Sequence, residues 1–157
     1  MAVRPLEIVT QRINSRLVRE LAAEVGFQLA GISRAGAVPD FDRFRDWVDR
    51  GLAGEMGYLT DHRADRRSAL DHLLPGVASV ISVGRLCAEP REGWMTRYSE
   101  GEDYHVTMRR DLEALGSRRA EYAAHEWRAC VYTAPILERS LARQSGLGWI
   151  GKNTCII

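Results

Sequence analysis

Hydrophobic residues recur at helical spacing in three stretches of the chain. The pattern predicts an amphipathic helix over residues 5–25 that ends at Gly26, a second over 40–51 with Asp40 as its N-cap, and a third over 103–115. We expect the aromatic face of the second helix to lie in the core. The positions that define the three faces are Ile8, Ile13, Leu17 and Leu21; Phe41, Phe44, Trp47 and Val48; and Met108, Leu112 and Leu115.

Short hydrophobic runs between the helices predict β-strands. A fourth helix is predicted after the third run, with Thr133 as its cap, Pro135 in its first turn and its end at Gln144. The stretch 84–101 is predicted to be a long loop. Alternating helices and strands indicate a single domain of the α/β or α+β class. The predicted strands are residues 27–32, 78–83, 129–132 and 154–157.

Composition indicates an ordinary globular protein without a strong preference for a charged partner. The 157 residues include 22 Lys and Arg against 21 Asp and Glu. We find no run of about 18 apolar residues that would span a membrane, and no apolar core of a secretion signal, so a cytoplasmic location without a membrane partner is expected. The three cysteines are far apart and are expected to be small buried residues rather than metal ligands; they are Cys87, Cys130 and Cys155.

A glycine-rich run at 146–152 is the most distinctive local feature. Gly146, Gly148 and Gly151 match the G-x-G-x-x-G dinucleotide fingerprint, but the predicted helix lies before the run instead of a strand. Asn153 follows Lys152 where a P-loop needs Ser or Thr. The alternative without a ligand is that Gly146 ends the preceding helix and the other two glycines belong to a loop.

Polar and aromatic residues gather at 97–105, before and within the third predicted helix. Asp103 suits a helix N-terminus, where a carboxylate interacts favourably with the helix dipole. Tyr104 and His105 are either ligand-binding or core-edge residues, and the pattern leaves both possibilities open. Since no H-x-x-x-H or H-E-x-x-H spacing accompanies them, no metal site is expected. Glu138 and Arg139 read as a surface pair.

Five segments occur in the same order and at about the same spacing in epoxyqueuosine reductases. The chain resembles that family over nearly its whole length, with residues 1–157 corresponding to its N-terminal domain, truncated before a ferredoxin-like domain. The segments are residues 54–58 (GEMGY), 73–76 (LLPG), 97–105 (RYSEGEDYH), 134–139 (APILER) and 146–152 (GLGWIGK).

The resemblance implies the reduction of epoxyqueuosine to queuosine in tRNA, with cobalamin and two four-iron four-sulfur clusters as cofactors. It also implies a nitroreductase-like, cobalamin-binding scaffold in which helices pack on a mixed sheet. The cluster ligands are expected to lie outside this chain. The expected partners are therefore a separate iron–sulfur protein and tRNA bound through downstream domains, and the chain alone is expected to be inactive. Asp61 is a weaker candidate near the corrin. The implied cobalamin-binding residues are Arg97, Tyr104, His105, Thr133, Gly146, Gly148, Trp149, Gly151 and Lys152.

Tyr132 stands where the family has an aspartate proton donor, immediately before a [Ser/Thr]-Ala-Pro turn. Opening an epoxide needs a positioned acid, and tyrosine, with a reference pKa of about 10, donates a proton less readily than an aspartate of about 3.9. Tyr132 is therefore the candidate catalytic residue. Two alternatives are a cobalamin-binding or carrier module without catalysis, and a structural remnant that binds nothing.

Overall fold

The computed structural model describes residues 13–86 and 102–157. The described parts contain five α-helices, two short 3-10 helices and one two-stranded sheet. In chain order these elements are α1 (Ser15–Glu24), β1 (Leu29–Arg34), α2 (Phe41–Asp49), η1 (Gly57–Leu59), α3 (Arg63–Arg66), η2 (Leu70–His72), β2 (Ser79–Gly84), α4 (Tyr104–Ala120) and α5 (Glu138–Gln144). Arg97 and Cys87, and the N-terminal part of the helix predicted over 5–25, lie outside the described residues.

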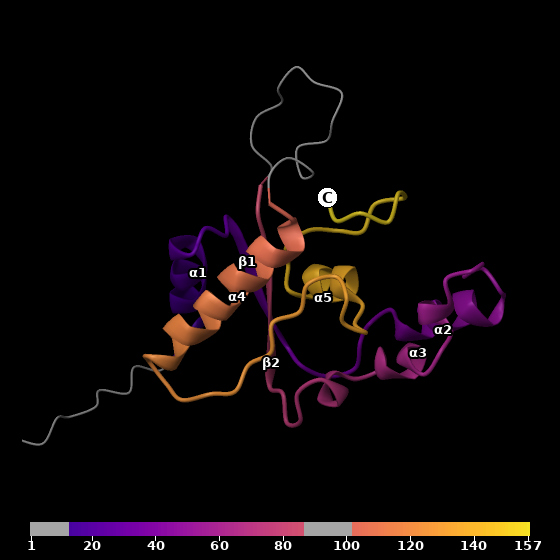
Figure 1. Ribbon diagram of the computed structural model, residues 1–157, viewed down its shortest axis with the longest axis horizontal. Helices are drawn as coiled ribbons and strands as arrows, with labels where there is room; N and C mark the ends of the chain where they lie inside the picture. Colours follow the sequence, from indigo (N-terminus) through magenta and orange to yellow (C-terminus); the bar gives the residue numbers. More distant parts are fainter. Residues whose placement is uncertain (1–12, 87–101) are drawn as a thin grey trace, which may run out of the picture.

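Helices cover both faces of the sheet (Figure 1). β1 and β2 pair antiparallel, so that Ala30 lies opposite Val83 and Gly31 opposite Ser82. Ala30 and Val83 pack toward α1 and α4. Gly31 faces the other way, against Ser145 at the end of α5, because neighbouring residues of a strand point to opposite faces. The two layers of helices around an antiparallel sheet confirm the α+β class.

The hydrophobic core lies between α1, α4 and the sheet. Leu21, Ala22, Phe27 and Leu115 form its buried centre. The predicted end of the first helix at Gly26 is confirmed: Gly26 has a φ of +94°, and the N–H of Phe27 donates to the carbonyl of Ala22 at 2.9 Å. This reversal is a Schellman-type helix end, and it turns the Phe27 ring straight into the core.

The helix predicted over 40–51 forms as α2, but the prediction that its aromatic face lies in the core is wrong. None of its residues is fully buried. Together with α3, α2 makes a lobe that extends away from the sheet (Figure 1), and its aromatic rings are only half-buried. The guanidinium of Arg67 lies 5.4 Å from the centroid of the Phe44 ring and supplies part of its cover.

Asp40 occupies the N-cap position of α2 without capping it through its side chain. Its carboxylate instead accepts hydrogen bonds from the Ser140 hydroxyl at 2.7 Å and from the Arg143 guanidinium at 3.0 Å, both on α5. A residue at the start of the lobe therefore connects it to a helix 100 residues further along the chain.

Three further predictions require correction. Residues 129–132 form no strand, because no described strand lies beside them to complete a ladder. Thr133 does not cap α5, which begins at Glu138 after Leu137. The Thr133 hydroxyl instead donates a hydrogen bond to the Val131 carbonyl within the 131–133 turn, so it does not cap the helix. The strand predicted over 154–157 is reduced to a single bridge between Ile150 and Ile156.

Across residues 13–86 and 102–157, we find no helix that combines the length and the apolar character required to cross a membrane.

Candidate functional site

A cavity of about 730 Å³ opens between four parts of the chain: β2, α4, α5, and the segment of residues 125–132 that follows α4. Its walls are mostly apolar, and a few polar groups interrupt them. Small-molecule and cofactor sites have this character, with volumes of roughly 300–1,000 Å³. Lining residues include Val80 and Ser82 of β2, Met108 and Leu112 of α4, Cys130, and Glu138 of α5.

Three of the residues implicated by the sequence lie close together, and two of them line this cavity. The rings of Tyr104 and His105 lie 4.0 Å apart at the start of α4, and the His105 ring lies 6.1 Å from that of Tyr132 in an edge-to-face arrangement. Tyr104 and Tyr132 both line the cavity. The tertiary structure therefore brings together two motifs separated by nearly thirty positions.

Asp103 fixes the orientation of His105. Its carboxylate accepts a hydrogen bond from the His105 backbone N–H at 2.9 Å, as the predicted role at the helix N-terminus requires, and contacts the imidazole Nδ1 at 2.9 Å. The backbone hydrogen bond, followed by the side-chain contact, lowers the pKa of Asp103. A carboxylate that stays ionised favours an imidazole with a proton on Nδ1.

Tyr132 sits in a turn with a positive φ of 56°, and its side chain is 72% exposed. The turn is closed by a hydrogen bond from the Thr133 N–H to the Val131 carbonyl at 2.5 Å. Thr133 lines a second, smaller hollow of about 360 Å³, together with Arg109 and Trp127. Tyr132 therefore lies at the rim of the main cavity, whereas Thr133 lines the second, smaller hollow.

Glu138 is a cavity residue for which the sequence predicted only a surface position. It lines the cavity, where one carboxylate oxygen accepts the Tyr132 backbone N–H at 2.8 Å. Burial raises the pKa of Glu138 and also that of Cys130, which lies in the same wall. The expected surface pair with Arg139 is not formed, because the Arg139 guanidinium donates to the carbonyl and hydroxyl of Thr154, both at 2.7 Å. The signal available in the sequence was the place of Glu138 beside the 132–135 turn.

The glycine run forms the end of α5 and a short hairpin. Gly146 has a φ of +79°, and the Leu147 N–H donates to the Ala142 carbonyl at 3.1 Å, so the helix-ending role is confirmed. Beyond it, Trp149 and Ile157 exchange backbone hydrogen bonds at 3.1 and 2.9 Å. Lys152 is exposed at the hairpin turn, and Trp149 is 63% exposed.

The hairpin requires a glycine at position 148, and at position 151 a larger residue would displace the end of a side chain. A Cβ atom on Gly148 would collide with the backbone of Ile157, and one on Gly151 would collide with the Ile157 side chain. The space freed by these glycines is thus filled by the chain itself. The hairpin contributes Ile156 to the cavity wall, and a cobalamin-binding role for Gly146, Gly148, Trp149, Gly151 and Lys152 stays a prediction.

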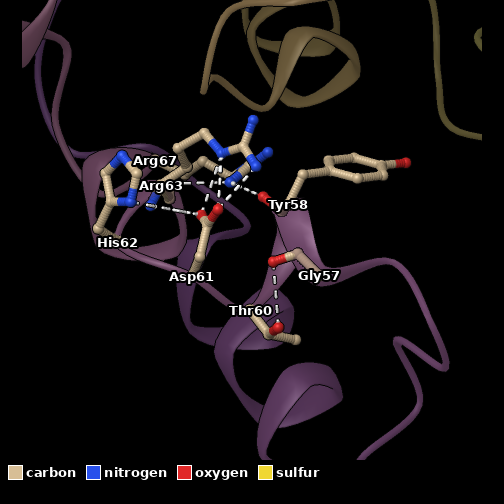
Figure 2. Close-up of polar contacts among 7 residues, drawn as sticks. All are labelled: Gly57, Tyr58, Thr60, Asp61, His62, Arg63 and Arg67. Atoms are coloured by element: carbon tan, nitrogen blue, oxygen red, sulfur yellow. Dashed lines mark hydrogen bonds and ion pairs between the residues drawn. The ribbon is translucent and has the colours of Figure 1, made fainter.

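Asp61 belongs to an ionic cluster on the α2–α3 lobe, outside the cavity lining (Figure 2). The Arg63 guanidinium donates to both carboxylate oxygens of Asp61, at distances between 2.6 and 3.0 Å, and the Arg63 backbone N–H donates at 2.9 Å. Arg67, buried beneath them, donates to the Arg63 carbonyl at 2.7 Å. The Asp61 carboxylate is therefore occupied by Arg63, which gives it a structural role.

We expect Asp61 to titrate at an unusually low pH. The side-chain hydrogen bond from Arg63, followed by the backbone one, lowers the pKa of Asp61 to about 2. Since this folded-state value lies below the unfolded value, the stabilisation is present above about pH 4 and is lost as the pH falls toward 2. Carboxyl-carbon NMR should give a midpoint near 2, and the difference in urea midpoint between the native protein and Asp61→Asn should shrink over the same range.

Asp65 provides a matched control for this titration. It is an aspartate of the same lobe that also contacts an arginine, Arg45, at 2.9 Å, but its side chain is 80% exposed. Asp65→Asn should change the urea midpoint little at any pH, because an exposed ion pair contributes little. An Asp61 midpoint near the ordinary value of about 3.9 would contradict the Arg63 contact.

Among the described residues, no three His, Cys, Asp or Glu side chains are grouped closely enough to hold a metal ion.

Comparisons with known proteins place this fold in a recognised class. A family model described as epoxyqueuosine reductase QueG, DUF1730, matches residues 67–133. The epoxyqueuosine reductase of Xanthomonas campestris pv. campestris is 40% identical over 153 residues, a match that covers 89% of this chain and 43% of the relative. The chain thus spans less than half the length of the curated relatives it matches.

Solved structures of epoxyqueuosine reductases have the same fold as this chain. The epoxyqueuosine reductase of Streptococcus thermophilus superposes with a TM-score of 0.72 at 24% identity, covering 92% of this chain and 42% of the other. An epoxyqueuosine reductase crystallised with an epoxyqueuosine-modified tRNA-Tyr stem loop gives a TM-score of 0.65 at 24% identity, covering 90% and 40%.

The fold is an α+β domain of the kind found in these reductases. The family-model match and the sequence identity to curated relatives confirm the resemblance of this chain to the epoxyqueuosine reductases.

Proposed function

We propose that this chain is the cobalamin-binding part of an epoxyqueuosine reductase, which acts in the cytoplasm on epoxyqueuosine in tRNA. The observation that carries the proposal is the apolar cavity with Tyr104 and Tyr132 in its lining, next to the turn at which the resemblance puts the proton donor. The tRNA substrate is supported by the relative crystallised with a modified stem loop.

The chemical character of the cavity lining supports a cobalamin ligand. Its apolar walls on β2 and α4 suit the face of a corrin, and polar groups at the rim suit the amide side arms. In this proposal Tyr104 and His105 would line the pocket, and Lys152 and Arg97 would pair with amide oxygens or the phosphate of the tail. When bound, cobalamin would supply the reducing cobalt centre, and iron–sulfur clusters outside this chain would supply its electrons.

The residues of this chain would have to supply the proton that the reaction needs. Conversion of an epoxide to an alkene consumes two electrons and two protons and releases the oxygen as water. A positioned acid therefore has to protonate the oxygen as the ring opens. Residue 132 stands at the cavity rim, where such an acid is needed, but a phenol that is 72% exposed is poorly placed to deliver a proton inward.

A titration with hydroxocobalamin, followed by visible absorption, tests the binding half of the proposal. We expect saturable binding with the spectral shift that accompanies loss of the lower base. Ser82→Trp would fill the cavity from β2 and should abolish the shift, whereas Arg16→Ala, on an exposed side chain of α1, should leave it unchanged. Circular dichroism of both variants is the control that tests whether they are folded. The absence of a shift in the folded native protein would refute the proposal.

A carrier or binding module without catalysis is the second candidate. The identity of Tyr132 favours it, because this residue removes the carboxylic acid from the turn and leaves the cavity intact. Both candidates predict cobalamin binding and differ only in turnover.

A further inference from the structure

The turn of residues 131–133 holds a backbone conformation that a tyrosine rarely adopts. Tyr132 has a φ of 56°, in the left-handed region that favours glycine. A bulky residue stays in this region only where surrounding contacts over-determine the backbone. The hydrogen bond from Thr133 to the Val131 carbonyl lies within the turn, so an additional contact from outside is needed to fix its orientation relative to the cavity.

Glu138 supplies a contact from outside the turn. It is the first residue of α5, and its Oε1 accepts the Tyr132 backbone N–H at 2.8 Å. Both residues line the main cavity. α5 itself is held against the sheet and the lobe, because it contacts both strands and its Ser140 hydroxyl donates to Asp40. The turn is thereby connected through a single carboxyl group to a helix fixed at several points.

The strength of this contact depends on the charge of Glu138. Burial raises the pKa of Glu138, opposed by the Tyr132 N–H and by the nearby side chains of Arg139 and His105. Cys130 lies beside it in the cavity wall, and Glu138 contributes to the raised pKa of that thiol. Because an ionised acceptor makes the stronger hydrogen bond, the contact is strongest above the pKa of Glu138 and weakens as the pH falls through it.

We propose that Glu138 is a positioning residue, whose carboxyl group holds the 131–133 turn, and with it the side chain of residue 132, at the rim of the cavity. The consequence for catalysis rests on the proposed function, since residue 132 acts on a substrate only if the cavity is an active site. The contact itself is a property of the chain without ligand, and it can be tested there.

Backbone NMR of the ligand-free chain measures the contact at the Tyr132 amide. We expect Glu138→Ala to lower the protection of this amide from hydrogen exchange by about 10-fold or more. Glu138→Gln keeps an oxygen that can accept the same N–H, so it should retain most of the protection. The Phe27 amide, which donates to Ala22 in the core, should stay protected in both variants and shows that they are folded.

A pH titration separates positioning by the carboxylate from a general structural effect. In the native protein the Tyr132 amide proton shift should titrate with a midpoint above the ordinary glutamate value of about 4.3. In Glu138→Gln the shift should be flat, and in His105→Gln and Cys130→Ser the titration should persist. The inference is overturned if Glu138→Ala leaves Tyr132 protection unchanged, or if the titration survives in Glu138→Gln or vanishes in His105→Gln.

The Glu138→Gln titration decides the inference even where Glu138→Ala fails to fold. Failure of the proposed function gives a different result from failure of this inference. A chain that binds no hydroxocobalamin but shows the expected Tyr132 titration retains the contact and lacks the cofactor site.

Discussion

Phe27→Ala is expected to lower the free energy of unfolding by about 3–5 kcal/mol, the cost of removing a large aromatic side chain from a packed core. Phe27 is only 2% exposed and lies in the buried cluster with Leu21, Ala22 and Leu115. Its ring also lies 5.4 Å from the Arg85 guanidinium, so truncation removes a cation–π contact as well. Equilibrium urea denaturation, monitored by circular dichroism, measures the change.

Val106→Ala is the matched control, because Val106 lies on α4 with its side chain 52% exposed. An exposed substitution of this kind should change the free energy of unfolding by about 0.5 kcal/mol or less. A loss below about 1 kcal/mol for Phe27→Ala would mean that the α1–β1 junction is not the centre of the core.

Tyr132→Asp is expected to raise turnover by about 10²–10⁴-fold, the usual contribution of a positioned general acid. The measurement requires a chimera in which this chain replaces the matching part of the Xanthomonas campestris epoxyqueuosine reductase, with its remaining portion retained. Formation of queuosine from epoxyqueuosine-containing tRNA is followed by mass spectrometry. Residue 132 lines the cavity, and an aspartate is shorter than the exposed phenol, so we expect its carboxyl group to lie at the cavity rim.

Tyr132→Asn controls for the change in size, because it resembles aspartate in shape and carries no acidic proton. We expect the asparagine chimera to stay as slow as the tyrosine one. Equal activity of the two variants would show that an acid at this position does not limit the reaction. Turnover by neither, in a chimera that binds hydroxocobalamin, would favour the carrier function.

Local signals in the sequence were sufficient for most of the secondary structure. Helix ends at Gly26 and Gly146 are short-range events, in which a glycine with positive φ lets the next N–H close the last turn. β2 coincides to within one residue with the Val- and Ile-rich run predicted over 78–83, and β1 begins two residues after the start of the strand predicted over 27–32. The strand predicted over 129–132 did not form, because a strand also needs a partner, and hydrophobic residues alone do not supply one.

Some residues of the candidate site could be predicted from the sequence, and others could not. Tyr104, His105 and Tyr132 could be named from their motifs, and the structure brings their rings within 4.0 and 6.1 Å of one another. Glu138 read as a surface residue, since its position in the sequence carries no information about which segment will cover it.

The sequence by itself determined the resemblance to the epoxyqueuosine reductases, a mixed class of helices and strands, and the segments from which the site is built, because motifs, helix ends and strand runs depend on neighbours in the chain. Only the tertiary structure decided what each polar side chain contacts. Asp40 bonds α5 instead of capping α2, Gly148 makes room for Ile157, and Glu138 holds the Tyr132 turn. These contacts join residues from separate elements, and packing of the elements must be complete before any of them can form.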